Sequence, residues 1–136
     1  MNDTAQRGWH FKRLRWSLQS LAAAGSEQPT LFPEHMMKAD DLALDFDHWA
    51  SFVRATYERD LSAAQADALA AIDRKLSTMS REGAEFDLDL WTDAALRTSE
   101  LWADVRLLAV AALEAFGWPV DAAHERQDDR GTPLVQ

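Results

Sequence analysis

The sequence of 136 residues contains no cysteine. This absence excludes disulfide bonds, thiolate catalysis and zinc sites with cysteine ligands from the chain. It also fits a reducing compartment, and we therefore expect a cytoplasmic protein. A chain of this length can bury about two-thirds of the surface that its unfolded form exposes, so a stable core needs neither a disulfide nor a structural metal ion.

Long apolar runs are also absent. No segment approaches the roughly 20 apolar residues that a membrane-spanning helix requires. Near the N-terminus, Lys12, Arg13 and Arg15 interrupt the apolar residues between Trp9 and Leu21, so this segment lacks the apolar core of a secretory signal. We expect a soluble chain with no membrane association.

The common catalytic motifs are missing as well. The sequence has no Gly-rich phosphate loop, no G-x-S-x-G nucleophile elbow, no H-E-x-x-H zinc motif and no calcium-loop spacing. Two Asp-x-x-His pairs, Asp45 with His48 and Asp121 with His124, would place an acid and an imidazole one helical turn apart, which is half of a metal site. A helical di-metal site needs further glutamates on neighbouring helices. We therefore expect no catalytic residue, no cofactor and no metal ion.

Basic residues are few outside the N-terminal segment. The chain has 14 basic and 23 acidic residues, which give a formal net charge of −9. Residues 1–24 contain four basic residues and one acidic residue (+3), which leaves ten basic and 22 acidic residues (−12) for the remainder. Phosphate binding draws on clustered lysine and arginine, so nucleic acid is not expected as the main ligand. An acidic body suits a basic protein partner instead.

The clearest helical pattern spans residues 99–118. Its apolar residues form one broad arc at 100° per residue: Leu101, Trp102, Val105, Leu108, Ala109, Ala112, Leu113, Ala115 and Phe116. Ser99 is a suitable N-cap, and Gly117 followed by Pro119 is a suitable stop. We expect the rest of the chain to pack around this helix.

Four further segments have helical patterns with suitable caps, namely residues 3–24, 47–59, 63–80 and 93–97. Ser62 and Gln65 have the spacing of a capping box. Together these segments predict a mainly α fold, a small bundle of four or five helices, in a single domain over residues 1–119. Residues 120–136 are polar and contain glycine and proline, which predicts a flexible C-terminal tail.

Residues 35–46 fit two different periods. Every second residue from Leu42 to Phe46 is apolar, as in a half-buried strand, but Ala39, Leu42 and Phe46 also have helical spacing. We predict a small β-hairpin that pairs residues 35–38 with residues 42–46, and helix is the alternative. A single hairpin is marginally stable, so it would depend on packing against the helices.

Three features indicate a surface for a partner. On the first helix, two tryptophans a heptad apart lie opposite the main apolar face and beside two cations. Acidic residues are concentrated in the segment before the helix predicted over residues 99–118. Two apolar residues of that helix lie away from its apolar arc. The candidate partner surface consists of Trp9, Trp16, Lys12, Arg13, Glu85, Asp87, Asp89, Leu107 and Val110. The alternative is structural, with the apolar residues covered by the chain itself and the acids at helix N-termini.

Two function classes follow. The charge asymmetry and the missing catalytic motifs favour a non-catalytic acidic protein that binds a basic protein partner, in the manner of an inhibitor or immunity protein. The alternative is a small helical enzyme or ligand-binding bundle with an aromatic pocket among Trp49, Tyr57, Trp91 and Trp102. Formation of a homo-oligomer is compatible with both classes.

Overall fold

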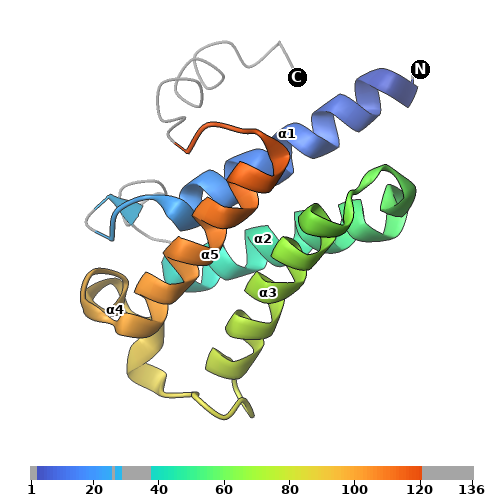
Figure 1. Ribbon diagram of the computed structural model, residues 1–136. Coiled ribbons are helices and arrows are strands. Elements are labelled where there is room, and N and C mark those ends of the chain that lie inside the picture. Colours follow the sequence, from blue (N-terminus) through green and yellow to red (C-terminus); the bar gives the residue numbers. More distant parts are fainter. Residues whose placement is uncertain (1–2, 26, 29–37, 121–136) are drawn as a thin grey trace.

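The structure is a computed structural model that describes residues 3–25, 27–28 and 38–120 (Figure 1). Within these residues the chain forms five α-helices and no strand, which confirms the predicted small helical bundle. The α-helices are α1 (Asp3–Ala22), α2 (Lys38–Thr56), α3 (Ala63–Met79), α4 (Asp93–Thr98) and α5 (Glu100–Phe116), and the short 3₁₀ helices η2 (Glu58–Asp60) and η3 (Leu88–Trp91) lie between them. No described helix has the length and apolarity that would let it span a membrane.

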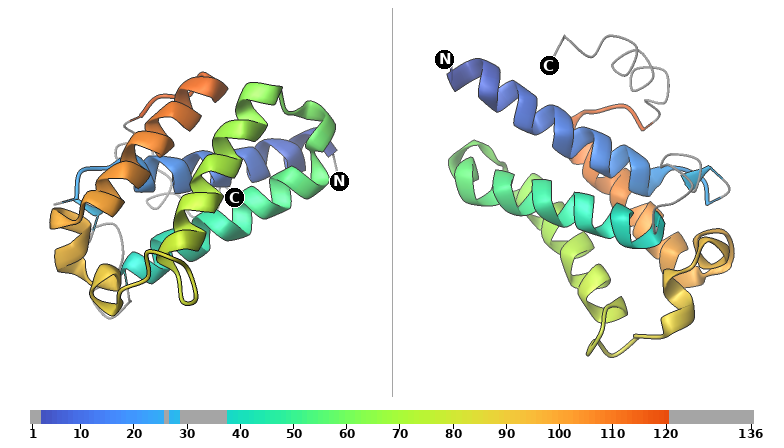
Figure 2. Two further views of the ribbon diagram at one scale, coloured as in Figure 1. Left: turned by 60° about the horizontal axis from the view of Figure 1, so that its bottom comes forward. Right: turned by 180° about the vertical axis from the view of Figure 1, so that it is seen from behind.

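Helix α5 lies at the centre of the packing. It packs against α1 on one side and α3 on the other, while α2 packs mainly on α1 (Figures 1 and 2). The buried side of α5 consists of Trp102, Val105, Ala109, Ala112 and Leu113, all of which belong to the predicted arc. The prediction that this helix forms the centre of the fold is therefore confirmed.

The predicted helix ends at Ser99, Gly117 and Ser62 are also confirmed. The Leu101 N–H donates to Ser99 Oγ at 3.1 Å, and Gly117 ends α5 in the left-handed conformation at φ 72°. Before α3, the Gln65 N–H donates to Ser62 Oγ, and the Ser62 N–H donates to Gln65 Oε1. Each of these contacts satisfies backbone groups that the helix itself leaves without a partner, so the local sequence determines where these helices begin or end.

The predicted hairpin over residues 35–46 is wrong, because residues 38–56 form the continuous helix α2. Residues 35–37 lie outside the described residues. The helical spacing prevails because Ala39, Leu42 and Phe46 are each only 1% exposed, and they continue into Ala50 and Val53 as one buried stripe. The predicted start of the helix near residue 47 is therefore wrong as well, since α2 begins at Lys38. The predicted C-terminal tail spans residues 120–136, and of these only Val120 belongs to the described residues.

The end of α1 is joined to α5 by Gln28, whose side chain is fully buried. Its Nε2 donates to the carbonyl oxygens of Ser20 and Leu21 at 3.1 and 3.0 Å, and these oxygens belong to the last turn of α1. Its Oε1 accepts a hydrogen bond from Arg106 Nη1 at 3.3 Å. The same Arg106 nitrogen donates to the Leu96 carbonyl oxygen at 3.1 Å, and burial lowers the pKa of this guanidinium. Gln28 and Arg106 together therefore connect three helices, α1, α4 and α5.

Candidate interaction surface

An open groove of about 620 Å³ lies between the first half of α2 and the segment of residues 80–92. Its lining is mainly apolar and includes Leu44, Phe86, Leu88 and Trp91, with Asp40 and Arg81 among its polar members. The segment after α3 lies at the end of the bundle remote from the N-terminus of α1 (Figure 2). The groove is therefore a feature of one end of the bundle.

Two leucines make this groove unusual. Leu44 is 63% exposed and Leu88 is 70% exposed. Leu44 points outward because the buried stripe of α2 already uses Ala39, Leu42 and Phe46. Leu88 begins η3, whose buried residue is Leu90. Each wall of the groove thus presents one large apolar side chain to solvent, and neighbouring exposed apolar groups are typical of an interaction site.

The lining residue Trp91, which we call the floor of the groove, is anchored to the core. Its Nε1 donates to the Met79 carbonyl oxygen at 3.0 Å, at the end of α3. Its ring also makes an edge-to-face contact with Trp102, at 5.4 Å between ring centroids. The fully buried Trp102 in turn donates from Nε1 to the Leu90 carbonyl oxygen at 2.6 Å. Because both indoles are held by hydrogen bonds, we expect the floor to be rigid.

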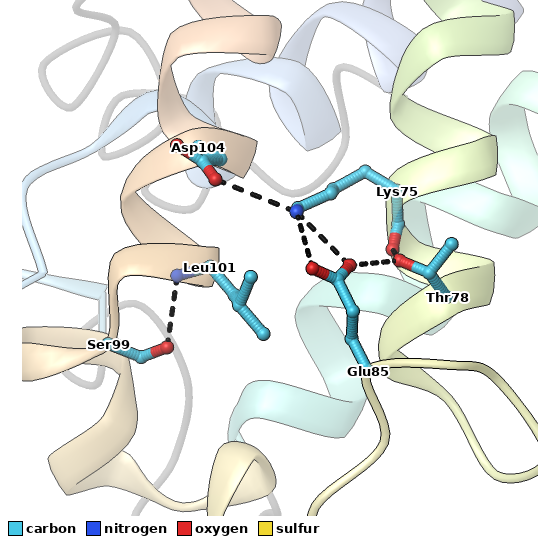
Figure 3. A network of polar contacts seen from close by, with 6 residues as sticks. All are labelled: Lys75, Thr78, Glu85, Ser99, Leu101 and Asp104. Carbon is cyan, nitrogen blue, oxygen red and sulfur yellow. Dashed lines mark hydrogen bonds and ion pairs between the residues drawn. The ribbon is translucent and has the colours of Figure 1, made fainter.

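A polar network holds the loop after α3 close to the bundle (Figure 3). The Lys75 ammonium lies 3.2 Å from Glu85 Oε1 and 3.5 Å from Asp104 Oδ2. The Thr78 hydroxyl donates to the same Glu85 carboxylate at 2.6 Å. The hydrogen bond from Thr78, followed by the one from Lys75, lowers the pKa of Glu85. The charge of Glu85 is therefore partly neutralised within the molecule.

The other charged residues in and beside the groove are mostly acidic. Asp87 and Asp89 flank Leu88 and are exposed, and Asp87 Oδ1 accepts from the Asp89 N–H at 2.9 Å. Asp40 lies on the opposite wall, in the first turn of α2. The Arg81 guanidinium lies over the Phe86 ring at 5.5 Å from its centroid. The charged residues that line the groove are thus Asp40 and Arg81, and the exposed Asp87 and Asp89 lie beside Leu88 in the sequence.

The candidate residues of α1 form a different cluster. The Arg13 guanidinium lies within 5.5 Å of the ring centroids of Trp9, Trp16 and Trp49, the last of which belongs to α2. Lys12 Nζ lies 5.0 Å from the Trp16 ring centroid. Trp16 is 7% exposed, whereas Trp9 is half-buried. The structure thus brings these four sequence-predicted residues together on α1, and Arg13 also joins them to α2 through Trp49.

The candidate residues of α5 lie apart from both groups. Leu107 is 69% exposed, and Val110 is half-buried. Neither residue takes part in the cation–ring contacts of the α1 cluster, and neither lines the groove beside Leu88. The sequence-predicted surface is thus divided between three places in the fold.

The four aromatic residues of the alternative pocket also separate into two groups. Trp91 contacts Trp102, as described above. Trp49 and Tyr57 both contact the His10 ring, and His10 Nδ1 lies 2.7 Å from the Tyr57 hydroxyl. Among the described residues, no ring contact joins the two groups. His48 is exposed and lies edge-on to Trp49, and the described part of the chain contains no group of three potential metal ligands.

Sequence reasoning did not identify the groove. The hairpin prediction places Leu44 in a strand, whereas a helical register through Ala39 and Phe46 leaves Leu44 on the solvent side. That mismatch is the signal that could have identified Leu44. The position of Leu88 beside Leu44 depends on the path of the chain after α3, which no local pattern specifies.

Comparison with models of protein families, with curated proteins and with solved structures found no match to this chain. The assignment of a function therefore depends on the geometry and charge of the surface described above.

Proposed function

We propose that this protein is a non-catalytic interaction protein that binds a basic protein partner through the groove of Leu44 and Leu88. An inhibitor or immunity protein would act in this way. The observation that carries the proposal is that two exposed leucines line one open groove, with Asp40 in its lining and the exposed Asp87 and Asp89 on either side of Leu88 in the sequence. We further propose that the protein acts in the cytoplasm, in keeping with its cysteine-free sequence.

The apolar part of the groove would supply affinity. Complete burial of a leucine side chain contributes about 1.5–3 kcal/mol, so covering the exposed parts of two leucines would contribute roughly 2–4 kcal/mol. Such exposed apolar side chains, concentrated in one patch, are typical of the centre of a protein interface.

The charges would supply specificity and a fast association rate. Asp40, Asp87 and Asp89 repel an acidic partner and attract a basic one, and the formal net charge of −9 extends this attraction over a longer range. Charges at the edge of an interface act mainly on the association rate, and salt screens them. We therefore expect binding to become slower, but not absent, at high salt.

The proposal can be tested by affinity capture from native lysate with matched baits. The baits are the unaltered protein, the double variant Leu44→Gln with Leu88→Gln, and the control variant Leu107→Gln. Leu107 is as exposed as Leu88 but lies outside the groove, and glutamine preserves helix propensity at both helical positions. The affinity of the recovered protein is then measured by calorimetry at two salt concentrations.

We expect a basic protein that binds the unaltered bait and the Leu107→Gln bait, but that binds the double variant at least tenfold more weakly. Equal recovery by all three baits would contradict the proposal. Recovery of the chain itself, confirmed by light scattering, would assign the groove to a homo-oligomer contact instead.

A further inference from the structure

A smaller pocket, of about 330 Å³, lies on α1 beside the segment that follows α5. Its lining consists of Gly8, Phe11, Lys12 and Arg15 from α1 and of Trp118 from that segment. The four α1 residues have the spacing i, i+3, i+4 and i+7, so they share one face of the helix. Small-molecule sites have volumes of about 300–1,000 Å³, so the pocket has the size for one small ligand.

The aromatic side of this pocket is built around Trp118. Its ring stacks on Phe116, with 4.3 Å between ring centroids and 9° between ring planes, and it meets Phe11 edge-on at 6.3 Å. The Trp118 N–H donates to a carbonyl oxygen in the last turn of α5 at 2.9 Å. The next residue, Pro119, accepts a hydrogen bond from Gln19 of α1 at 2.8 Å. A ring that is held in place before binding provides a flat apolar surface at little cost in ordering.

The charged side of the pocket is positive. Lys12 and Arg15 are both half-buried, and the described residues that line the pocket include no acid. Helix α1 contains four basic residues and one acidic residue, although the whole chain has a formal net charge of −9. An ammonium and a guanidinium that line one pocket can bind a carboxylate or a phosphate through charge-assisted hydrogen bonds. The pocket therefore favours an anionic group.

Gly8 leaves room in this pocket. It lies within α1, where glycine stabilises a helix less than any residue except proline. A Cβ added at Gly8 would meet no atom within 4 Å, so no close contact among the described residues requires a glycine here. A side chain at this position would lie on the same face of α1 as Lys12, which is four residues further along. A substitution of Gly8 therefore alters the pocket and leaves the core intact.

We infer that this pocket binds a small molecule with one flat aromatic ring and one carboxylate or phosphate group. The ring would lie against Trp118 and Phe11, and the anionic group would contact Lys12 and Arg15. The pocket shares no lining residue with the groove described above, so this inference goes beyond the proposed function and does not depend on it.

Three naphthalene compounds test the inference, namely naphthaleneacetate, naphthyl phosphate and the neutral naphthaleneacetamide. Each is titrated into the full chain, and the NMR signal of the Trp118 indole N–H, assigned with the variant Trp118→Phe, reports binding. We expect at least one of the two anions to bind with a dissociation constant of about 1 mM or lower, and the neutral amide to bind at least tenfold more weakly. The anion that binds more tightly identifies the ligand as a carboxylate or a phosphate.

Removal of the two charges should weaken binding of this anion. We expect at least a tenfold loss for the double variant Lys12→Gln with Arg15→Gln. The control is Arg59→Gln with Arg74→Gln, which removes the same charge from two exposed positions outside the pocket and should bind as the unaltered protein does. Circular dichroism shows whether each double variant is folded.

A second pair of variants tests the pocket without removal of a side chain. Gly8→Glu adds a carboxylate that can pair with Lys12, and Gly8→Ala adds a single methyl group. Both new residues are better helix formers than glycine, so both variants should fold. We expect Gly8→Glu to bind the anion at least tenfold more weakly than Gly8→Ala does.

Three results would each overturn the inference. The first is that neither anion produces a saturable shift of the Trp118 signal. The second is that the neutral amide binds as tightly as the anions. The third is that Gly8→Glu binds the anion as tightly as Gly8→Ala. None of these results would affect the proposed function, because the groove lies elsewhere in the fold.

Discussion

Replacement of Gln28 by leucine tests whether this residue holds α1 to the central helix. Leucine has a similar size and retains the apolar contacts, but it removes the two hydrogen bonds to the last turn of α1 and the one from Arg106. Two buried carbonyl oxygens then lose a donor, and a half-buried guanidinium loses an acceptor. Each buried polar group without a partner costs about 1–3 kcal/mol, and part of this cost is relieved by relaxation or water. We therefore expect Gln28→Leu to lower the free energy of unfolding by about 2–4 kcal/mol.

Urea denaturation followed by circular dichroism measures this loss directly. In thermal unfolding, a domain of this size should lose about 6–16 °C in its midpoint for a loss of that magnitude. A double-mutant cycle with Arg106→Met should show a coupling of about 0.5–3 kcal/mol between the two positions, because each variant removes the same hydrogen bond.

The control is Gln6→Leu, since Gln6 is exposed on α1 and should change the unfolding free energy by less than about 0.5 kcal/mol. If Gln28→Leu also costs less than about 0.5 kcal/mol, the connection that we assign to Gln28 does not exist in solution.

Three further predictions concern the fold and the loop beside the groove. Gly25→Ala should lower the free energy of unfolding in urea by about 1–3 kcal/mol, because the added Cβ would overlap the Leu96 carbonyl oxygen. Gly8→Ala, where a Cβ meets open space, should raise the free energy of unfolding by about 0.5–1 kcal/mol. The opposite order of stabilities would refute this packing. The lowered pKa of Glu85 stabilises the folded state above the ordinary value of 4.5, and this contribution is lost as pH falls through the lower folded-state pKa. Denaturation of Glu85→Gln should therefore differ from that of the unaltered protein at pH 7 and converge with it at the most acidic pH, and a constant difference would refute the assignment. Trp102→Ala should cost about 3–5 kcal/mol, because this side chain is fully buried, and a smaller loss would show that the floor of the groove is not anchored as described.

The helices with strong caps could be predicted from the sequence. Around α3 and α5 the signals are local, because Ser62, Ser99 and Gly117 act on backbone groups within a few residues. The apolar arc of α5 was predictable for the same reason, since burial of Trp102 and its neighbours follows from a period of 3.6 residues.

The first half of α2 and the role of Gln28 could not be predicted in this way. Around Leu42 the apolar residues fit both the period of a strand and the period of a helix. Only the packing of Ala39 and Phe46 against the rest of the bundle selects the helix. Gln28 lies in a segment with the composition of a linker, and one of its partners, Arg106, lies 78 residues further along the chain. Sequence patterns describe neighbours along the chain, whereas these contacts depend on the tertiary arrangement.

The predicted partner surface combined residues that the fold separates. Trp9 and Trp16 have the sequence pattern of an exposed apolar face, but Arg13 lies over both rings and also over Trp49 of α2. A helical period cannot show that a second helix lies alongside. The groove of Leu44 and Leu88 arises for the same reason, as a product of two segments that are far apart in the sequence.

The most direct test of the proposed function is amide hydrogen exchange of the protein alone and in complex with the captured basic partner. We predict slower exchange in residues 38–48 and 80–92 on binding, with little change in the first half of α1 and around Leu107. Slower exchange confined to the Trp9 region of α1 or to the Leu107 face of α5, with none in the groove segments, would contradict it.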